Sequence, residues 1–240
     1  MKAVVAIPTY NEAQNLPGIV ARTRRAVTAD ILVVDDASPD GTGELAEKLA
    51  AADPAIHVMH RAGKGGLGKA YLAAFAWAEE HGYTHVVEMD ADGSHHPEEL
   101  HRLLARADEP DHPDLVIGSR YTRGGRIRGW SKARELLSRA GNLYIKVMLG
   151  LPVADATAGF RVYRLDTLAR IGLDVEASGY FFQTDMTAHV VSHGGTAVEV
   201  PITFTERLAG ESKLSGAVFS ESLRRTTKMG VRRYLGLLKR

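Results

Sequence analysis

Short apolar runs alternate with longer helical patterns through the first half of this 240-residue chain. The apolar runs predict strands at Ala3–Ile7, Ile31–Val34, Ile56–Met59, His85–Met89 and Leu115–Ile117. Stretches rich in alanine, leucine and glutamate near residues 13–27, 42–52, 68–81 and 97–107 predict helices between them. Such alternation is typical of a doubly wound, mostly parallel α/β sheet.

Polar or glycine-rich segments follow four of the predicted strands. They are "PTYNE" (8–12), "DDASPDG" (35–41), "RAGKGGLGK" (61–69) and "DADGSHH" (90–96). In an open α/β sheet, ligands bind beyond the carboxyl ends of the strands. We therefore expect these segments to form one site along a single edge of the sheet.

The pattern changes after residue 120. Residues 120–139 hold seven Arg or Lys residues and one acid, Glu135, and three glycines in this region predict a mobile loop. Helices are expected at about 134–149 and around 180–193, and "TAVEVPITF" (196–204) predicts a further strand. Because arginine suits phosphate recognition, the basic region predicts a second anion site.

The C-terminal residues 215–240 predict a basic amphipathic helix, which follows a main domain of residues 1–214. The mostly apolar side carries Phe219, Leu223, Thr227, Gly230, Tyr234 and Leu237. The basic side carries Arg224, Arg225, Lys228, Arg232 and Lys239. A basic amphipathic helix can lie on an anionic membrane. A helix that covers the core with a solvated basic face fits the pattern equally well.

Composition excludes several classes of function. The net charge of +1 gives no global indication of nucleic-acid binding, and the absence of cysteine excludes disulfides and thiolate metal ligands. The apolar run in "MKAVVAIPTYNE" is too short for a signal peptide, and no stretch approaches the roughly 18–20 apolar residues that span a bilayer.

Two acidic pairs, Asp35–Asp36 and Asp90 with Asp92, follow predicted strands. Carboxylates brought close together raise one another's pKa unless a cation lies between them. Helix capping, by Asp40 or Ser94, is the structural alternative. Two acidic pairs that face one another favour a divalent cation, and an all-oxygen ligand set suits Mg²⁺ or Mn²⁺ completed by phosphates and water.

Two other motifs point to rival sites. "GKGGLGK" (63–69) approaches a phosphate-binding P-loop, but Ala70 replaces the hydroxyl that would hold Mg²⁺, so a glycine-rich turn into a helix is preferred. His95 and His96 raise the possibility of zinc, which the lack of cysteine and of a second histidine pair disfavours. One of these histidines is expected to pack beside the metal loop.

Eight motifs, in order along nearly the whole chain, resemble the polyprenol-phosphate (dolichol-phosphate) mannose synthases, which are inverting family-2 glycosyltransferases of GT-A fold. These motifs are "PTYNE" (8–12), "VVDDASPDGT" (33–42), "GLGKAY" (66–71), "MDADGSHHP" (89–97), "GSRY" (118–121), "AGFRVYR" (158–164), "GYFFQTDM" (179–186) and "RLAGESKL" (207–214). The resemblance implies transfer of mannose from GDP-mannose to a polyprenyl or dolichyl phosphate, with inversion to a β-linked product.

The resemblance also implies roles for individual residues. The donor nucleotide and its diphosphate would be bound by Pro8, Tyr10, Glu12, Val34, Asp36, Asp90, Ala91, Asp92, Arg120, Arg207 and Lys213. The metal would be held by Asp90, Asp92 and Ser94, with Asp92 as the main ligand, and the acceptor phosphate would be bound by Arg120, Arg134 and Ser138. Asp185 stands where many family-2 enzymes keep an acidic residue. Because a phosphate is already an anionic nucleophile at neutral pH, the reaction needs no general base.

Three further expectations concern setting and alternatives. Because no membrane-spanning run is visible, we expect a cytoplasmic protein attached peripherally to the membrane through its C-terminal helix, with a separate anchoring protein as a possible partner. A polyprenyl-phosphate glucosyltransferase that uses UDP-glucose is the nearest rival. A P-loop kinase is discouraged by Ala70, and a non-enzymatic membrane-binding module leaves the acidic pairs unexplained.

Overall fold

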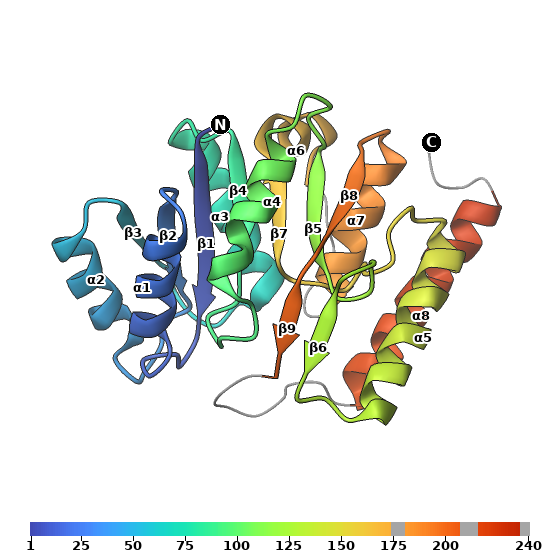
Figure 1. Ribbon diagram of the computed structural model, residues 1–240, viewed down its shortest axis with the longest axis horizontal. Coiled ribbons are helices and arrows are strands. Elements are labelled where there is room, and N and C mark those ends of the chain that lie inside the picture. Colours follow the sequence, from blue (N-terminus) through green and yellow to red (C-terminus); the bar gives the residue numbers. More distant parts are fainter. Residues whose placement is uncertain (174–180, 207–215, 236–240) are drawn as a thin grey trace.

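The computed structural model describes residues 1–173, 181–206 and 216–235 (Figure 1). Its main sheet has seven strands in the order β3-β2-β1-β4-β7-β5-β8. These are β1 (Ala3–Thr9), β2 (Asp30–Asp35), β3 (Ile56–His60), β4 (His85–Glu88), β5 (Leu115–Ser119), β7 (Arg161–Arg164) and β8 (Ala197–Pro201). All neighbouring pairs are parallel except those that β7 forms with β4 and β5. The predicted mostly parallel α/β sheet is therefore confirmed.

Helices cover both faces of this sheet. One face packs against α1 (Leu16–Ala26), α2 (Thr42–Ala52) and α4 (Leu100–Ala107), the last preceded by the short 3₁₀ turn η1 (Pro97–Glu99). The other packs against α3 (Leu67–Glu80), α5 (Lys132–Leu149), α6 (Leu165–Ile171) and α7 (Phe182–Ser192). In Figure 1, α1 and α4 lie in front of the sheet and α3 and α7 behind it.

The continuous apolar runs of the strands produce this three-layer arrangement. Successive side chains of a strand point to opposite faces, so Val4 and Ala6 enter one core cluster while Val5 and Ile7 enter the other. A strand buried on both faces therefore contains almost no polar residue. The polar residues collect where the strands end, at the lower edge of the sheet in Figure 1.

Two strands of the C-terminal half differ from the sequence expectation. The segment 196–204 divides at Pro201 into β8, which pairs with β5, and β9 (Thr203–Thr205), which pairs with β6 (Arg126–Arg128). Part of the arginine-rich region is thus paired strand, where a mobile loop was expected. The loop is tight as well, because a Cβ at Gly125 would lie only 2.6 Å from the carbonyl oxygen of Arg120.

The helix α8 (Gly216–Tyr234) packs against α5. Contact is close at Gly230, where an added Cβ would lie 2.7 Å from Cε of Met148, and the Tyr144 and Thr227 hydroxyls are 2.7 Å apart. The buried face of α8 runs through Thr226 and Gly230, whereas Leu223 and Tyr234 of the predicted apolar side are exposed. Phe219 and Leu237 are outside the residues whose side chains are described.

Within the described ranges, no helix is both long enough and apolar enough to cross a membrane.

Candidate active site

The loops that follow β1 and β2 lie together at the carboxyl edge of the sheet, as the sequence predicts. Pro8 and Val34 are aligned partners in the parallel β1–β2 pair. The backbone N–H of Glu12 donates to the hydroxyl of Thr42 (3.0 Å), which joins the first loop to α2. The ring of Tyr10 lies beneath the Lys64 ammonium, 4.2 Å from the ring centroid. The predicted nucleotide-binding residues therefore come from neighbouring segments of the fold.

The first acidic pair does not face the second around a metal ion, so this part of the sequence hypothesis is wrong. Asp35 accepts hydrogen bonds from the Thr9 hydroxyl (3.0 Å) and from the Ser38 hydroxyl (2.6 Å), and it holds the loop after β2. Asp36 is buried and accepts from Arg61 Nη1 (2.5 Å) and from the Gly65 N–H (3.0 Å). Asp36 is thus paired with a cation and Asp35 is held by neutral donors, so both carboxylates are engaged by bonds within the protein.

The glycine-rich segment is a turn into α3, as the preferred interpretation predicts. Gly66 has a φ of +91° and stands just before the helix begins at Leu67. A side chain at Gly65 would collide with Arg61, because an added Cβ would lie 2.4 Å from Arg61 Nη2. The segment therefore folds over Asp36.

The second acidic pair lines a cavity of about 250 Å³ at the end of β4. Asp92 is buried, and its Oδ1 accepts the Ser94 N–H (3.0 Å). The Tyr71 hydroxyl donates to Asp90 Oδ1 (3.4 Å), while Ala91 between the two acids is buried. Asp90, Asp92 and Ser94 all line the cavity.

The donor set of this loop fits a hard divalent cation. Across the described residues, no three His, Cys, Asp or Glu side chains gather closely enough to hold a metal ion. Two carboxylates and a hydroxyl at a cavity wall match a site that Mg²⁺ or Mn²⁺ shares with the phosphates of a ligand and with water. The set is unsuited to a closed structural zinc site, which takes four protein ligands.

A third carboxyl group, that of Glu88, lies close to the acidic pair in the sequence but carries no full negative charge. Glu88, two residues before Asp90, is fully buried, and neither of its carboxyl oxygens has a hydrogen-bond partner. Burial raises the pKa of Glu88 to about 8, so this carboxyl keeps its proton at neutral pH. The side chain therefore adds no full charge beneath Asp90 and Asp92.

The two histidines of the loop have structural contacts. His95 is buried, stacks on Phe160 with ring centroids 5.1 Å apart, and accepts the Asp90 N–H at Nδ1 (3.2 Å). Burial lowers the pKa of His95 to about 4, so the ring is neutral at neutral pH. His96 Nε2 contacts the Thr205 hydroxyl (2.8 Å). These contacts agree with packing beside the metal loop.

Arg120 lines the cavity but has a buried partner that sequence reasoning missed. Its Nε and Nη2 donate to the two carboxylate oxygens of Asp155 (2.7 and 2.6 Å), and Nη2 also donates to Thr157 (2.8 Å). Burial alone would raise the pKa of Asp155, but the Arg120 guanidinium overrides burial and holds this pKa below its ordinary value. Much of the charge of Arg120 is therefore balanced within the protein.

Arg134 is the second arginine on the cavity wall, and its environment is more open. Its guanidinium lies over the Trp130 ring, 4.2 Å from the centroid, and Nη1 donates to Glu206 Oε1 (2.6 Å). Ser138, one helical turn further along α5, lines the same cavity and accepts a hydrogen bond from the Tyr121 hydroxyl (2.6 Å). The fold thus places Arg120, Arg134 and Ser138 in the same cavity as the acidic loop.

The remaining predicted residues are placed less completely. Asp185 is half-buried in the first turn of α7 and does not line the cavity, although Gln183 of the same turn does. Arg207 and Lys213 are outside the described residues. Gln183, Asn142 and Trp130 were not found from the sequence, because isolated amides and a tryptophan give no pattern that separates a cavity wall from a core.

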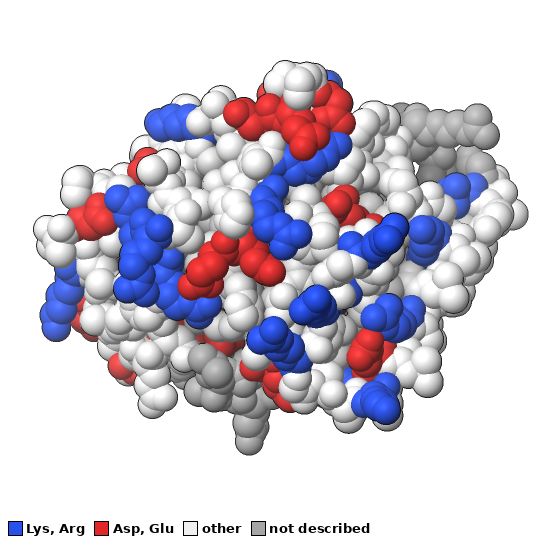
Figure 2. Space-filling model, in the orientation of Figure 1, with Lys and Arg blue, Asp and Glu red and all other residues white. Residues whose placement is uncertain are grey.

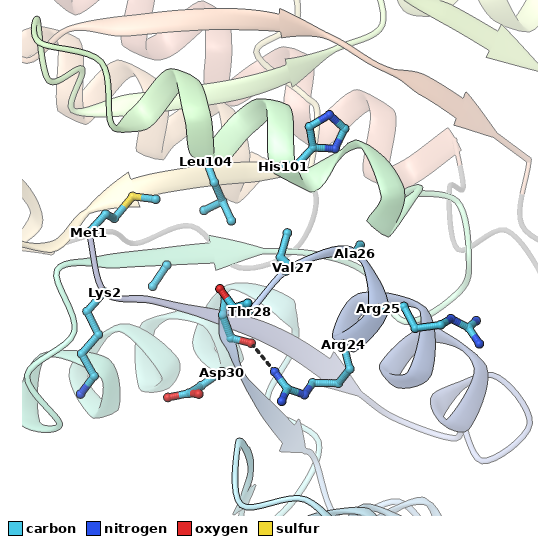
Figure 3. Close-up of a pocket in the computed structure, with 12 residues that line it drawn as sticks. Met1, Lys2, Arg24, Arg25, Ala26, Val27, Thr28, Asp30, His101 and Leu104 are labelled. Carbon is cyan, nitrogen blue, oxygen red and sulfur yellow. Dashed lines mark hydrogen bonds between the residues drawn. The ribbon is translucent and has the colours of Figure 1, made fainter.

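A larger cavity of about 600 Å³ lies at the opposite edge of the sheet, where β1 and β2 begin (Figure 3). Met1, Lys2, Arg24 and His101 contribute to its wall. Arg24 is already bonded there, through Nη1 to the Ala29 carbonyl (3.2 Å) and through Nε to Asp53 (2.8 Å). None of the strand-end motifs reaches this cavity, so it is not the candidate active site.

The loops after β1 and β2, the acidic pair and Arg120 lie at the carboxyl edge of the α/β sheet, where such folds bind their ligands. These residue types suit a ligand that carries a diphosphate, such as a nucleotide sugar. The profile of "Glycosyl transferase family 2" matches residues 4–172. The chain belongs to this family of glycosyltransferases, as its motifs predicted.

Two relatives are similar along almost their whole length. The chain is 52% identical over 233 residues to the undecaprenyl-phosphate mannosyltransferase of Micrococcus luteus, which covers 96% of this chain and 95% of the relative. It is 52% identical over 234 residues to the polyprenol monophosphomannose synthase of Mycolicibacterium smegmatis, and this match covers 96% of this chain and 88% of the relative.

Solved structures share the fold at low identity. The mannosyltransferase PcManGT from Pyrobaculum calidifontis, solved with GDP-Man and Mn²⁺, has a TM-score of 0.63 and 18% identity. The similarity covers 98% of this chain but only 64% of that one. Mannosyl-3-phosphoglycerate synthase from Rubrobacter xylanophilus has a TM-score of 0.67 and 19% identity, and the similarity covers 97% of this chain and 74% of that one. These similarities confirm the predicted GT-A fold.

Proposed function

We propose that the protein transfers mannose from GDP-mannose to a polyprenyl phosphate, with inversion at the anomeric carbon. The observation that carries the proposal is that Asp90 and Asp92 share one cavity with Arg134 and Ser138. The two carboxylates suit a metal-bound diphosphate, and Arg134 and Ser138 suit a phosphate monoester. The names of the two relatives at 52% identity support mannose as the sugar and a polyprenyl phosphate as the acceptor.

A divalent cation, Mg²⁺ or Mn²⁺, is part of this proposal. Asp92 and Asp90, with Ser94, would hold it beside the diphosphate of the donor. When bound, the cation would neutralise the negative charge that develops on the departing nucleoside diphosphate. The Mn²⁺ seen with GDP-Man in PcManGT supports the assignment of a divalent ion.

The protein's task at the acceptor is alignment. A phosphate monoester carries about −1.5 to −2 charges at neutral pH, so its oxygen attacks without loss of a proton to a base. Arg134 and Ser138, one turn apart on a rigid helix, would orient that oxygen toward the anomeric carbon. Arg120 would add positive potential while Asp155 keeps it in place. Arg207 and Lys213 are proposed to contact the diphosphate.

The surface beside the cavity is suited to a lipid-linked acceptor. Among the described residues, the exposed large hydrophobic side chains other than Met1 all lie on α5, on α8 or directly after it: Leu136, Leu137, Leu143, Val147, Leu223, Val231, Tyr234 and Leu235. Leu137 also lines the cavity, next to Ser138. A polyprenyl chain could therefore extend over this apolar surface while its phosphate enters the cavity.

Exposed basic side chains lie on the same two helices. Lys132 on α5 and Arg224, Lys228 and Arg232 on α8 are exposed. Figure 2 shows several blue basic side chains at the lower right, with a smaller red acidic patch between them, where β6 and α5 lie in Figure 1. Apolar side chains bordered by cations favour an anionic membrane surface. We therefore propose peripheral attachment through α5 and α8 together, at the cytoplasmic face, with or without a separate anchoring protein.

The double substitution Leu136→Gln with Leu143→Gln should weaken binding to anionic vesicles by about tenfold or more, since each leucine loses apolar burial on the membrane. These side chains are 70% and 62% exposed, so the fold should tolerate the change. Vesicle sedimentation measures the effect, with Ala105→Gln on the exposed face of α4 as the control. Equal binding by the double variant would refute the role of α5, and binding insensitive to salt would refute the electrostatic part.

The proposed reaction is tested with purified protein, a polyprenyl phosphate and either labelled GDP-mannose or labelled UDP-glucose, with and without EDTA. We expect label from GDP-mannose to enter the lipid, and we expect EDTA to stop the transfer. Transfer from UDP-glucose alone would retain the acceptor and replace the donor. Transfer that survives EDTA would remove the metal from the proposal.

A further inference from the structure

The two arginines on the cavity wall differ in how firmly they are bound to their own carboxylates. The Arg120–Asp155 pair is bidentate and buried. The pair between Arg134 and Glu206 has a closest N–O distance of 2.6 Å, and its side chains are 34% and 45% exposed. Exposed single pairs are weak and exchange readily, whereas a buried pair is costly to break. An incoming phosphate will therefore exchange with Glu206 rather than with Asp155.

Glu206 lies beside Arg134, which lines the cavity, and is held there by its backbone. Its N–H donates to the Arg128 carbonyl (2.9 Å), and the preceding residue, Thr205, donates through its own N–H to Ser94 O (3.1 Å) in the metal loop. Gly129, with a φ of +89°, leaves the room that this approach needs, because an added Cβ would lie 2.8 Å from Cβ of Glu206. The carboxylate consequently stays close to Arg134 even after their hydrogen bond is broken.

We propose that the Glu206 carboxylate binds the Arg134 guanidinium where the acceptor phosphate would bind it, so that carboxylate and phosphate compete for one guanidinium. This inference rests on the proposed function and adds a residue that sets acceptor affinity. Phosphate carries more charge than a carboxylate and has three acceptor oxygens, so it displaces Glu206 when it binds. The displaced carboxylate then repels the bound phosphate, and acceptor affinity is lower than Arg134 alone would give.

The test is the affinity of Glu206→Gln for farnesyl phosphate, a short polyprenyl phosphate, measured without donor at low salt. We expect the dissociation constant to fall about two- to fivefold relative to the unsubstituted protein. Farnesol, the uncharged alcohol, should show no such gain. Glu135→Gln is the matched control, because Glu135 pairs with Arg139 on the same helix, and Arg139, unlike Arg134, does not line the cavity.

A double-substitution cycle assigns the effect to Arg134. Arg134→Gln with Glu206→Gln should bind farnesyl phosphate no better than Arg134→Gln alone, because the competed group is gone. Unchanged or weaker binding by Glu206→Gln, in protein with an unchanged melting temperature, would overturn competition and indicate that Glu206 orients Arg134. If the unsubstituted protein neither binds farnesyl phosphate nor transfers a sugar to it, the proposed function fails and this inference fails with it.

Discussion

Asp92→Asn should lower the rate of mannose transfer by about a thousandfold while leaving the protein folded. Asp92 is buried at the cavity wall and would be the main holder of the divalent cation. Asparagine keeps the size and can still accept the Ser94 N–H bond that shapes the loop, so the loss should fall on catalysis. Initial rates at saturating Mg²⁺ or Mn²⁺, with the melting temperature as a control for folding, measure it.

Asp185→Asn is the informative comparison. Asp185 does not line the cavity, and a phosphate acceptor needs no general base. The Asp185→Asn variant should therefore lose less than the roughly hundredfold in rate that a general base contributes at minimum. Equal loss of activity in the folded Asp92 and Asp185 variants would contradict the base-free mechanism.

The second large effect is on stability. Asp155→Asn should destabilise the protein by about 3–5 kcal/mol, because it leaves the Arg120 guanidinium buried without a compensating charge. The melting temperature should fall by about 10 °C for a chain of this size. Urea unfolding followed by circular dichroism gives the free energy. Asp111→Asn is the control: Asp111 also forms a bidentate pair, with Nη1 and Nη2 of Arg106, but on the surface, so that variant should change little.

The effect of Asp155 also has a pH dependence of known sign. Since Arg120 holds the pKa of Asp155 below its usual value of 3.8, the carboxylate stabilises the fold at all pH values above that range. The contribution disappears as the pH falls through the folded-state pKa. The difference in unfolding free energy between Asp155→Asn and the unsubstituted protein should therefore be constant near neutrality and shrink below about pH 4. A difference that persists undiminished in acid would show that packing, not charge, is responsible.

Much of the main sheet could be predicted because its strands are buried on both faces. The runs Ala3–Ile7 of β1 and Leu115–Ile117 of β5 are uninterrupted by polar residues, and each leads into a polar motif. The strand β7 could not be assigned from pattern alone, because Arg161 and Arg164 flank a core of only two residues. Arg161 is fully buried and donates to carbonyls of Ala156, Ala158 and Gln183, bonds that only the assembled fold provides.

The site was predictable as a set of motifs but not as a set of partners. The position of Asp90 and Asp92 follows from the end of β4, and that of Tyr10 and Asp36 from the ends of β1 and β2. The partner of Arg120 is 35 positions away, and that of Arg134 is 72 positions away. No local period or spacing encodes such pairs. Sequence reasoning therefore assigned the same role to both arginines, although of the two only Arg134 has an exposed carboxylate partner that a phosphate can replace.

The sequence by itself determined the alternating α/β pattern, the edge at which the motifs gather, and the family to which they belong. Local periodicity and short motifs carry this information, since each depends on residues only a few positions apart. Only the tertiary structure decided which charges are already paired, that the first acidic pair is bonded within the protein, and that the exposed large apolar side chains of the described residues, Met1 apart, lie on α5, on α8 or directly after it. These properties depend on burial and on distances between remote segments, and both exist only once the chain has folded.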